Sequence, residues 1–162
     1  MRTLKYIIAV ILIIFTVSPC LANEIKCREI AHREYPEDTK MQKYIYTKQV
    51  SAARYMATVK DQDVKNISLR EYPEDFSMQK YVYDKQSSAK RYMSSVTDSD
   101  VKTISLREYP HDYSMQKYVY DKQLSAKQYM AAMPSSSAKQ NAIRQYHHDY
   151  SMQKYIYDKL QQ

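Results

Sequence analysis

The sequence predicts an all-α protein built from tandem helix-turn-helix repeats, and three observations lead to this prediction. The chain has no glycine in 162 residues, whereas ordinary usage would give about eleven. Ala, Lys, Gln, Met and Arg, which all favour helix, are plentiful. A block of similar sequence also recurs at a constant interval. We therefore expect a short α-solenoid or an irregular helical bundle.

The repeated block begins at Arg33, Arg70, Arg107 and Arg144, so that successive copies start 37 residues apart and the last copy is truncated. Columns of identical residues run through the copies without a change of spacing. They include a Met-Gln pair, a Tyr-x-Tyr pair and an aspartate close to the start of each block. The repeat domain is predicted to cover residues 23–162.

Each unit is expected to contain one long and one short helix. The long helix of the second copy has an apolar stripe at Met78, Tyr81, Val82, Ala89, Tyr92, Met93 and Val96, with Phe76 and Tyr83 on a second face. Pro73 and Asp75 mark its start. The short helix is predicted within residues 97–109, with Thr97 or Asp98 as its N-cap.

Residues 1–22 have the pattern of a secretory signal peptide. A positive start at Arg2 and Lys5 precedes an apolar run at 6–17, which is shorter than the about 18 residues of a membrane anchor. Cleavage is predicted after Ala22. A lipoprotein signal ending at Cys20 is the alternative, and Pro19 directly before that cysteine disfavours it. We expect a secreted or periplasmic protein without a transmembrane segment after cleavage.

The charge of the chain is mildly basic. The formal net charge is +7, and it falls to +5 without the signal segment, which holds two cations and no acidic residue. Because acidic and basic residues are interspersed, an ordinary mixed surface explains this composition. The excess would still allow peripheral contact with an anionic membrane or polymer. Nucleic acid is not expected as a partner, since the chain shows no nucleic-acid-binding module.

Two features that suggest chemistry have simpler explanations. Cys27 falls in the column of Val64 and Val101, so we expect a buried apolar side chain rather than a reactive thiol. His147 and His148 stand in columns that hold proline and glutamate in other copies, whereas a zinc site needs three or four ligands in fixed positions. The sequence therefore predicts no metal and no cofactor.

No catalytic residue is predicted either. The chain shows no nucleophile paired with a base, and a chain without glycine has no Gly-rich phosphate loop. An active site is also usually assembled once, whereas repeated units present similar surfaces several times. A non-enzymatic role is therefore favoured.

The repeated Tyr, Lys and Gln columns suggest a ladder that contacts an extended partner once per unit. The partner would be an unknown protein, peptide or envelope polymer. Packing between units would also require identical residues in identical columns, so both explanations remain open. The predicted ligand contacts are Lys43, Tyr46, Gln79, Lys80, Tyr83, Lys117, Tyr120, Lys154 and Tyr157.

The block Tyr-Pro-x-Asp-(Tyr/Phe)-x-Met-Gln-x-Tyr resembles a motif of uncharacterised bacterial exported repeat proteins, in which the first aromatic residue is often tryptophan. The resemblance covers most of residues 23–162. It implies a bacterial origin and transfers no activity, cofactor or catalytic residue. The sequence thus predicts an exported binding or structural module of the cell envelope or periplasm. The alternative is a basic, tyrosine-rich surface protein that associates electrostatically with membrane or anionic polymer.

Overall fold

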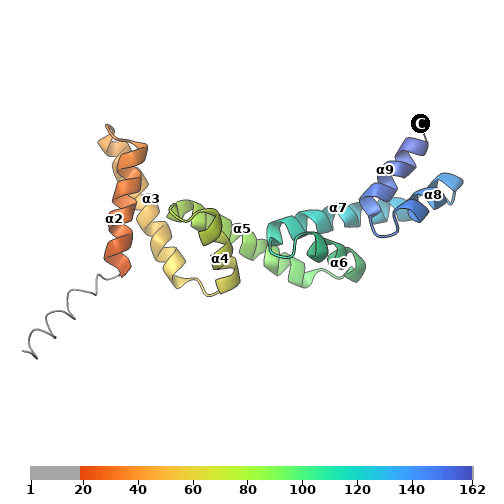
Figure 1. The fold of residues 1–162 in the computed structure, drawn as a ribbon, viewed down its shortest axis with the longest axis horizontal. Coiled ribbons are helices and arrows are strands. Elements are labelled where there is room, and N and C mark those ends of the chain that lie inside the picture. The colour runs from red at the N-terminus through yellow and green to blue at the C-terminus, as the bar shows by residue number, and fades with distance from the viewer. Residues whose placement is uncertain (1–18, 162) are drawn as a thin grey trace, which may run out of the picture. The chain divides into compact units, whose positions relative to one another are not determined.

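The computed structural model describes the backbone of residues 19–161 and the side chains from residue 23 onward, and its regular elements are all α-helices (Figure 1). The prediction of an all-α fold is confirmed for this part of the chain. The predicted signal peptide lies outside the described residues, apart from its last turn at 19–22. No helix among the described residues is long and apolar enough to cross a membrane.

Long and short helices alternate along the chain. The long helices are α3 (Thr39–Thr58), α5 (Phe76–Ser95), α7 (Tyr113–Ala132) and the shorter last one, α9 (Tyr150–Leu160). Before them come α2 (Pro19–Glu34), α4 (Gln62–Glu71), α6 (Ser99–Glu108) and α8 (Ser137–Gln145). The four long helices begin in the same column of the repeated block.

Most helices begin at a side chain that accepts hydrogen bonds from the free N–H groups of the first turn. Asp112 caps α7 by accepting from the N–H of Met115, and Asp75 does the same for the N–H of Met78 at 3.0 Å. Of the two predicted caps for α6, the structure selects Asp98. The remaining caps are Asp38 for α3, Asp61 for α4, Ser136 for α8 and Asp149 for α9.

The helices end without a left-handed residue, as expected of a chain that lacks glycine. No described residue has a positive φ angle. The long helices α3 and α7 end when Val59 and Met133 turn to extended backbone. The short helices end at a tyrosine whose N–H donates to a carbonyl of the last turn, as Tyr109 does to Ser105. Glycine-based caps are therefore not needed.

The described part of the chain forms two compact units that divide between Val82 and Tyr83, and α5 contributes to both. In the first unit α2 packs against α3. Its core contains Ile30, Ala31 and Ile45, with Tyr46 and Phe76 packed at the edge. Cys27 is fully buried, as predicted from its column, and burial raises the pKa of its thiol to about 11. The thiol is therefore protonated at neutral pH.

The second unit is held together by packing of α6 and α9 on α7, and of α8 on α9. It contains two clusters of the same construction. In one, Met93 from α5, Val101 from α6 and Tyr120 from α7 pack together. In the other, Met130, Ala142 and Tyr157 come from α7, α8 and α9. In each cluster a methionine and a tyrosine from successive long helices enclose a small residue of the short helix between them.

The predicted apolar stripe of the long helix is partly wrong. Val82, Ala89 and Met93 are buried as expected, but Tyr81 is 60% exposed. The buried line instead includes Gln79 and Gln86, which alternate with those three residues at spacings of three and four. Because a hydrophobicity pattern counts glutamine as a surface residue, the predicted stripe was rotated away from the true one.

Candidate binding surface

The first glutamine column holds the end of each short helix. Gln79 is 1% exposed, and its Nε2 donates to the carbonyl oxygen of Tyr72 at 2.7 Å. Gln116 makes the same bond to Tyr109 at 2.7 Å. This carbonyl belongs to the residue that ends the short helix, where backbone acceptors lack helical partners. Gln79 was predicted to contact a ligand. This prediction is wrong, because the side chain is buried and bonded within the fold.

A second glutamine column joins consecutive long helices. The Gln86 side chain donates through Nε2 to Oδ1 of Asp112 at 2.9 Å and accepts at Oε1 from the N–H of Ser114 at 3.1 Å. Both partners lie at the start of the next long helix. The same pair of bonds is made by Gln49 to Asp75 and Ser77, and by Gln123 to Asp149 and Ser151. We call this arrangement the glutamine clamp. The hydrophobicity pattern did not predict this clamp, although its glutamine recurs in three repeats.

The second tyrosine of the Tyr-x-Tyr pair is a core residue in the second, third and fourth repeats. Tyr83, Tyr120 and Tyr157 are 9%, 3% and 7% exposed. The Tyr120 ring meets Tyr92 edge-on at 6.1 Å between centroids, a favoured arrangement of aromatic rings. Tyr157 meets Tyr129 in the same way at 6.3 Å. These three tyrosines were predicted to face a ligand, and the prediction is wrong because packing covers them.

The lysine three residues before each of these tyrosines also makes contacts within the fold. Lys80, Lys117 and Lys154 are half-buried and lie 4.5, 4.4 and 4.3 Å above the rings of Tyr55, Tyr92 and Tyr129. In the second unit these lysines also pair with an aspartate one turn further on, Asp121 and Asp158 respectively.

Those aspartates accept hydrogen bonds from the same tyrosines. The Tyr92 hydroxyl donates a hydrogen bond to Asp121. This bond, together with burial, raises the pKa of Tyr92 to about 12. The bonds from Lys154 and Tyr129 hold the pKa of Asp158 below its usual range. Lysine, tyrosine and aspartate thus form one polar contact between successive long helices. These lysines therefore contribute to packing rather than to an open ligand surface.

The first repeat differs from the others at these columns. Lys43 is exposed and Tyr46 is half-buried. The guanidinium of Arg28, from α2, lies 5.8 Å from the centre of the Tyr46 ring. Of the predicted ligand contacts, Lys43 is exposed, whereas Tyr46 is half-buried like Lys80, Lys117 and Lys154.

A different column remains exposed in every repeat. The first tyrosine of each Tyr-x-Tyr pair is 57–60% exposed, and an exposed lysine follows it one helical turn later. Positions four apart share one helix face, so each tyrosine and lysine form a pair. We call these the exposed Tyr–Lys pairs. They are Tyr44 with Lys48, Tyr81 with Lys85, Tyr118 with Lys122, and Tyr155 with Lys159.

In the second unit one of these lysines borders a shallow hollow. Its volume is about 260 Å³, and its lining includes Lys85 and Ser88 from α5 and Ser114 and Lys117 from α7. No acidic side chain lines it. The predicted apolar stripe includes Tyr81, so the sequence pattern does not predict this exposed surface.

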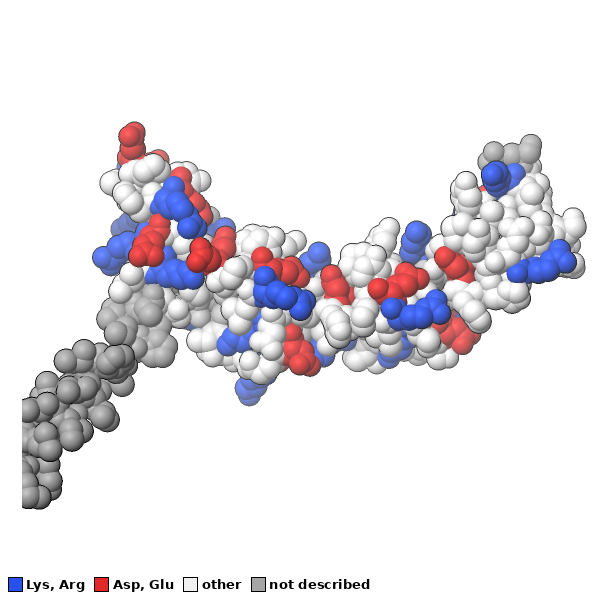
Figure 2. Space-filling model, in the orientation of Figure 1, with Lys and Arg blue, Asp and Glu red and all other residues white. Residues whose placement is uncertain are grey.

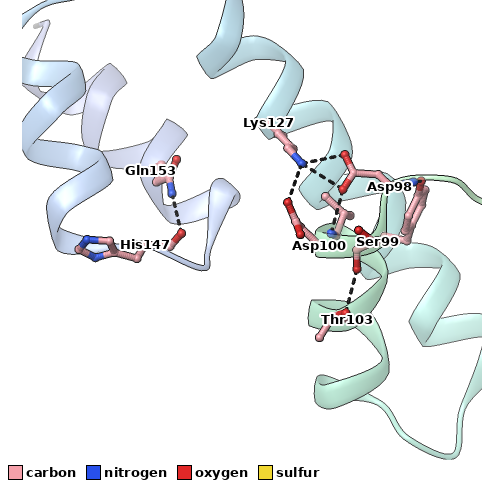
Figure 3. Close-up of polar contacts among 9 residues, drawn as sticks. Asp98, Ser99, Asp100, Thr103, Lys127, His147 and Gln153 are labelled. Carbon is pink, nitrogen blue, oxygen red and sulfur yellow. Dashed lines mark hydrogen bonds and ion pairs between the residues drawn. The ribbon is translucent and has the colours of Figure 1, made fainter.

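Charges on the surface are mixed, as the composition predicted. Figure 2 shows Lys and Arg interspersed with Asp and Glu on the face drawn. Several of them are paired. Lys127 of α7 reaches both carboxylate oxygens of Asp98, at 3.0 and 2.8 Å, and Oδ2 of Asp100 at 3.4 Å (Figure 3). This cluster fixes the start of α6 against α7 and is not a free basic patch.

The Lys127–Asp98 pair gives the second unit a pH-dependent stability. The hydrogen bond from Lys127 lowers the pKa of Asp98, so the ionised carboxylate favours the folded state. This contribution is complete above the unfolded pKa of about 4 and is lost as the pH falls through the folded pKa. We expect Asp98→Asn, which keeps an N-cap, to lower the free energy of unfolding by about 0.5–1 kcal/mol at pH 7.

At pH 2 the same substitution is expected to have a smaller effect, because protonation of Asp98 removes its ion pair with Lys127. Urea unfolding of the two proteins at both pH values checks this. Equal differences at pH 7 and pH 2 would show that the cap, and not the ion pair, carries the effect.

No protein-family model, curated protein or solved structure matches this chain. Within the part of the chain that the structure describes, no group of three or more His, Cys, Asp and Glu side chains is placed to hold a metal ion. The arrangement consists of helical repeats whose polar columns join the repeats to one another, with one aromatic and basic column left exposed.

Proposed function

We propose that the protein is an exported, non-enzymatic binding module that holds an extended partner of the cell envelope or periplasm through its exposed Tyr–Lys pairs. One observation carries this proposal: the pair recurs in all four repeats although packing does not require it. The buried columns are identical because each must fit the same interface. That explanation does not apply to a tyrosine that is about 60% exposed.

The chemistry of the pair suits a chain-like partner. A tyrosine ring offers a flat apolar face and a hydroxyl, and it loses little conformational entropy on binding. The lysine one turn away adds a cation for an acidic group. A single exposed pair binds weakly, but several pairs that contact one chain increase affinity by avidity. Repeats would therefore be useful to a module that binds a polymer or an extended peptide.

A second candidate is electrostatic association with an anionic surface. It is supported by the net charge, which is +5 without the predicted signal segment, and by the exposed arginine that begins each block. Charge association predicts release by salt, because exposed charges are screened within about 10 Å at 0.1 M ionic strength. Binding through the tyrosine rings predicts retention at high salt.

The test is a co-sedimentation titration of the purified protein with isolated cell envelopes at 50 mM and 500 mM NaCl. Tyr118→Ala is expected to weaken binding by about 3–10-fold, and Tyr155→Ala added to it by a similar factor, as expected of contacts worth about 1 kcal/mol each. Tyr118→Phe is the matched control, since it keeps the ring.

Equal binding by the wild type and the doubly substituted protein would reject the exposed pairs as the binding surface. Complete release at 500 mM NaCl would favour the electrostatic candidate instead. Circular dichroism of each variant confirms that the helices are intact.

A further inference from the structure

An open hollow in the first unit lies between α2 and α3. Its volume is about 760 Å³. Its lining includes Ile25, Arg28 and Ala31 from α2, and Lys43 and Tyr46 from α3. Ile25 is 53% exposed, so the hollow offers apolar as well as basic side chains.

In the second unit, the equivalent space between a short helix and the long helix that follows it is filled. Between α6 and α7, the space receives Tyr92 and Met93 from the preceding long helix, and they pack on Val101 and Tyr120. Between α8 and α9 it receives Tyr129 and Met130, which pack on Ala142 and Tyr157. In both cases the occupant is a helix that carries a Tyr-Met pair. The interface thus occurs twice with one construction.

The residues that meet this helix are present in the first unit too. Tyr46 stands in the column of Tyr120, and Lys43 in that of Lys117, which lies above the ring of Tyr92. Yet Tyr46 is only half-buried and Lys43 is exposed. No long helix precedes α2 among the described residues.

The start of α3 also differs in the way expected of an unfilled interface. In later repeats, the clamp glutamine accepts a hydrogen bond from the N–H of the fourth residue after the proline column, as Gln86 does from Ser114. In α3 the equivalent N–H, that of Lys40, donates to Asp38 instead at 3.0 Å. Asp38 therefore accepts from both Lys40 and Met41. A glutamine from outside could take over one of these bonds.

We propose that this hollow is the docking site for an α-helix of a partner protein that carries a Tyr-Met pair with a glutamine six residues before the tyrosine. This is the spacing of Gln86 to Tyr92 and of Gln123 to Tyr129. The partner's tyrosine packs edge-on against Tyr46 and beneath Lys43, its methionine enters the hollow beside the Tyr46 ring, and its glutamine bonds to Asp38 and the N–H of Lys40.

A second copy of this chain is not the occupant. Each of its Tyr-Met pairs is already engaged in its own fold: Met56, Met93 and Met130 are 4%, 3% and 3% exposed. Helix α9 has no such pair, and Leu160 occupies the column of the clamp glutamine. The partner is therefore another protein with an unpaired helix of this pattern. This surface is separate from the exposed Tyr–Lys pairs, so either proposal can fail alone.

The test uses a probe taken from the chain itself. A fluorescent peptide of residues 84–96, held helical by a hydrocarbon staple on the face opposite Tyr92, is titrated with the purified protein and followed by anisotropy. We expect saturable binding, weakened at least tenfold when Tyr92 and Met93 of the peptide are replaced by alanine. In the protein, Ile25→Glu and Lys43→Glu are expected to weaken binding by the same order. Both side chains are exposed, so neither change should disturb folding.

Ile143→Glu is the matched control, because Ile143 is 39% exposed on α8 of the second unit and should leave binding unchanged. The proposal is overturned if the peptide fails to bind at 1 mM protein, or if Ile25→Glu or the alanine peptide binds as well as the parent. Sedimentation velocity adds a separate check. A dimer that Ile25→Glu dissociates would show that a second copy occupies the hollow and would also overturn the proposal.

Discussion

Tyr120→Ala is expected to lower the free energy of unfolding of the second unit by about 3–5 kcal/mol, the usual loss when a large buried ring is removed. Tyr120 is 3% exposed, packs with Met93 and Val101, and meets Tyr92 edge-on. Its hydroxyl also accepts from the N–H of Asp98 at 3.3 Å. Urea unfolding followed by circular dichroism at 222 nm measures the change.

Tyr118→Ala supplies the matched control, two residues away on the same helix. Its ring is 59% exposed, so we expect a change within about 0.5 kcal/mol. Tyr120→Phe separates ring packing from the hydroxyl bond and should cost about 1 kcal/mol. Similar losses for Tyr118→Ala and Tyr120→Ala would contradict the assignment of one ring to the core and the other to the surface.

Gln123→Leu is expected to destabilise the second unit by about 2–6 kcal/mol, because two groups at the start of α9 lose a partner at about 1–3 kcal/mol each. The N–H of Ser151 would be left without the Gln123 oxygen, and Asp149 without the Gln123 amide. Leucine has nearly the same volume, so the loss would report hydrogen bonds and not a cavity. Thermal and urea unfolding check the result.

Gln128→Leu on the same helix is the control, since Gln128 is exposed. A double-mutant cycle of Gln123→Leu with Asp149→Ser, which keeps an N-cap, should be non-additive by at least about 0.5 kcal/mol. If Gln123→Leu proved as harmless as Gln128→Leu, the clamp would be a consequence of packing and not one of its causes.

The clamp explains how a chain of low hydrophobicity, with a mean hydropathy of −0.71, forms ordered repeats. Each long helix contributes few large aliphatic side chains to its interface. Much of the contact is made by glutamine amides and by rings with lysines above them. Buried polar groups of this kind are stable only when each finds its partner in the right place. Repetition of the same residues in every unit meets that requirement.

The candidate site was the least predictable part of the protein. The sequence identified the right segment, since the Met-Gln-Lys-Tyr-x-Tyr block contains both the residues that pack between successive long helices and the exposed tyrosine. It assigned the two tyrosines the wrong way round, with Tyr83 exposed and Tyr81 packed. Tyr81 and Tyr83 lie about 100° to either side of the buried Val82 around the helix, so a modest rotation of a stripe that includes Val82 exchanges which of the two tyrosines is covered.

The sequence by itself determined the helical class, the alternation of long and short helices, their aspartate caps and the burial of Cys27. These features depend on local signals: the lack of glycine, capping residues beside proline, and the substitution of cysteine in a valine column. Only the tertiary structure decided which polar side chains are buried. Gln86 is buried because its amide meets the start of a helix that follows 26 residues later in the chain, and no local pattern contains that partner.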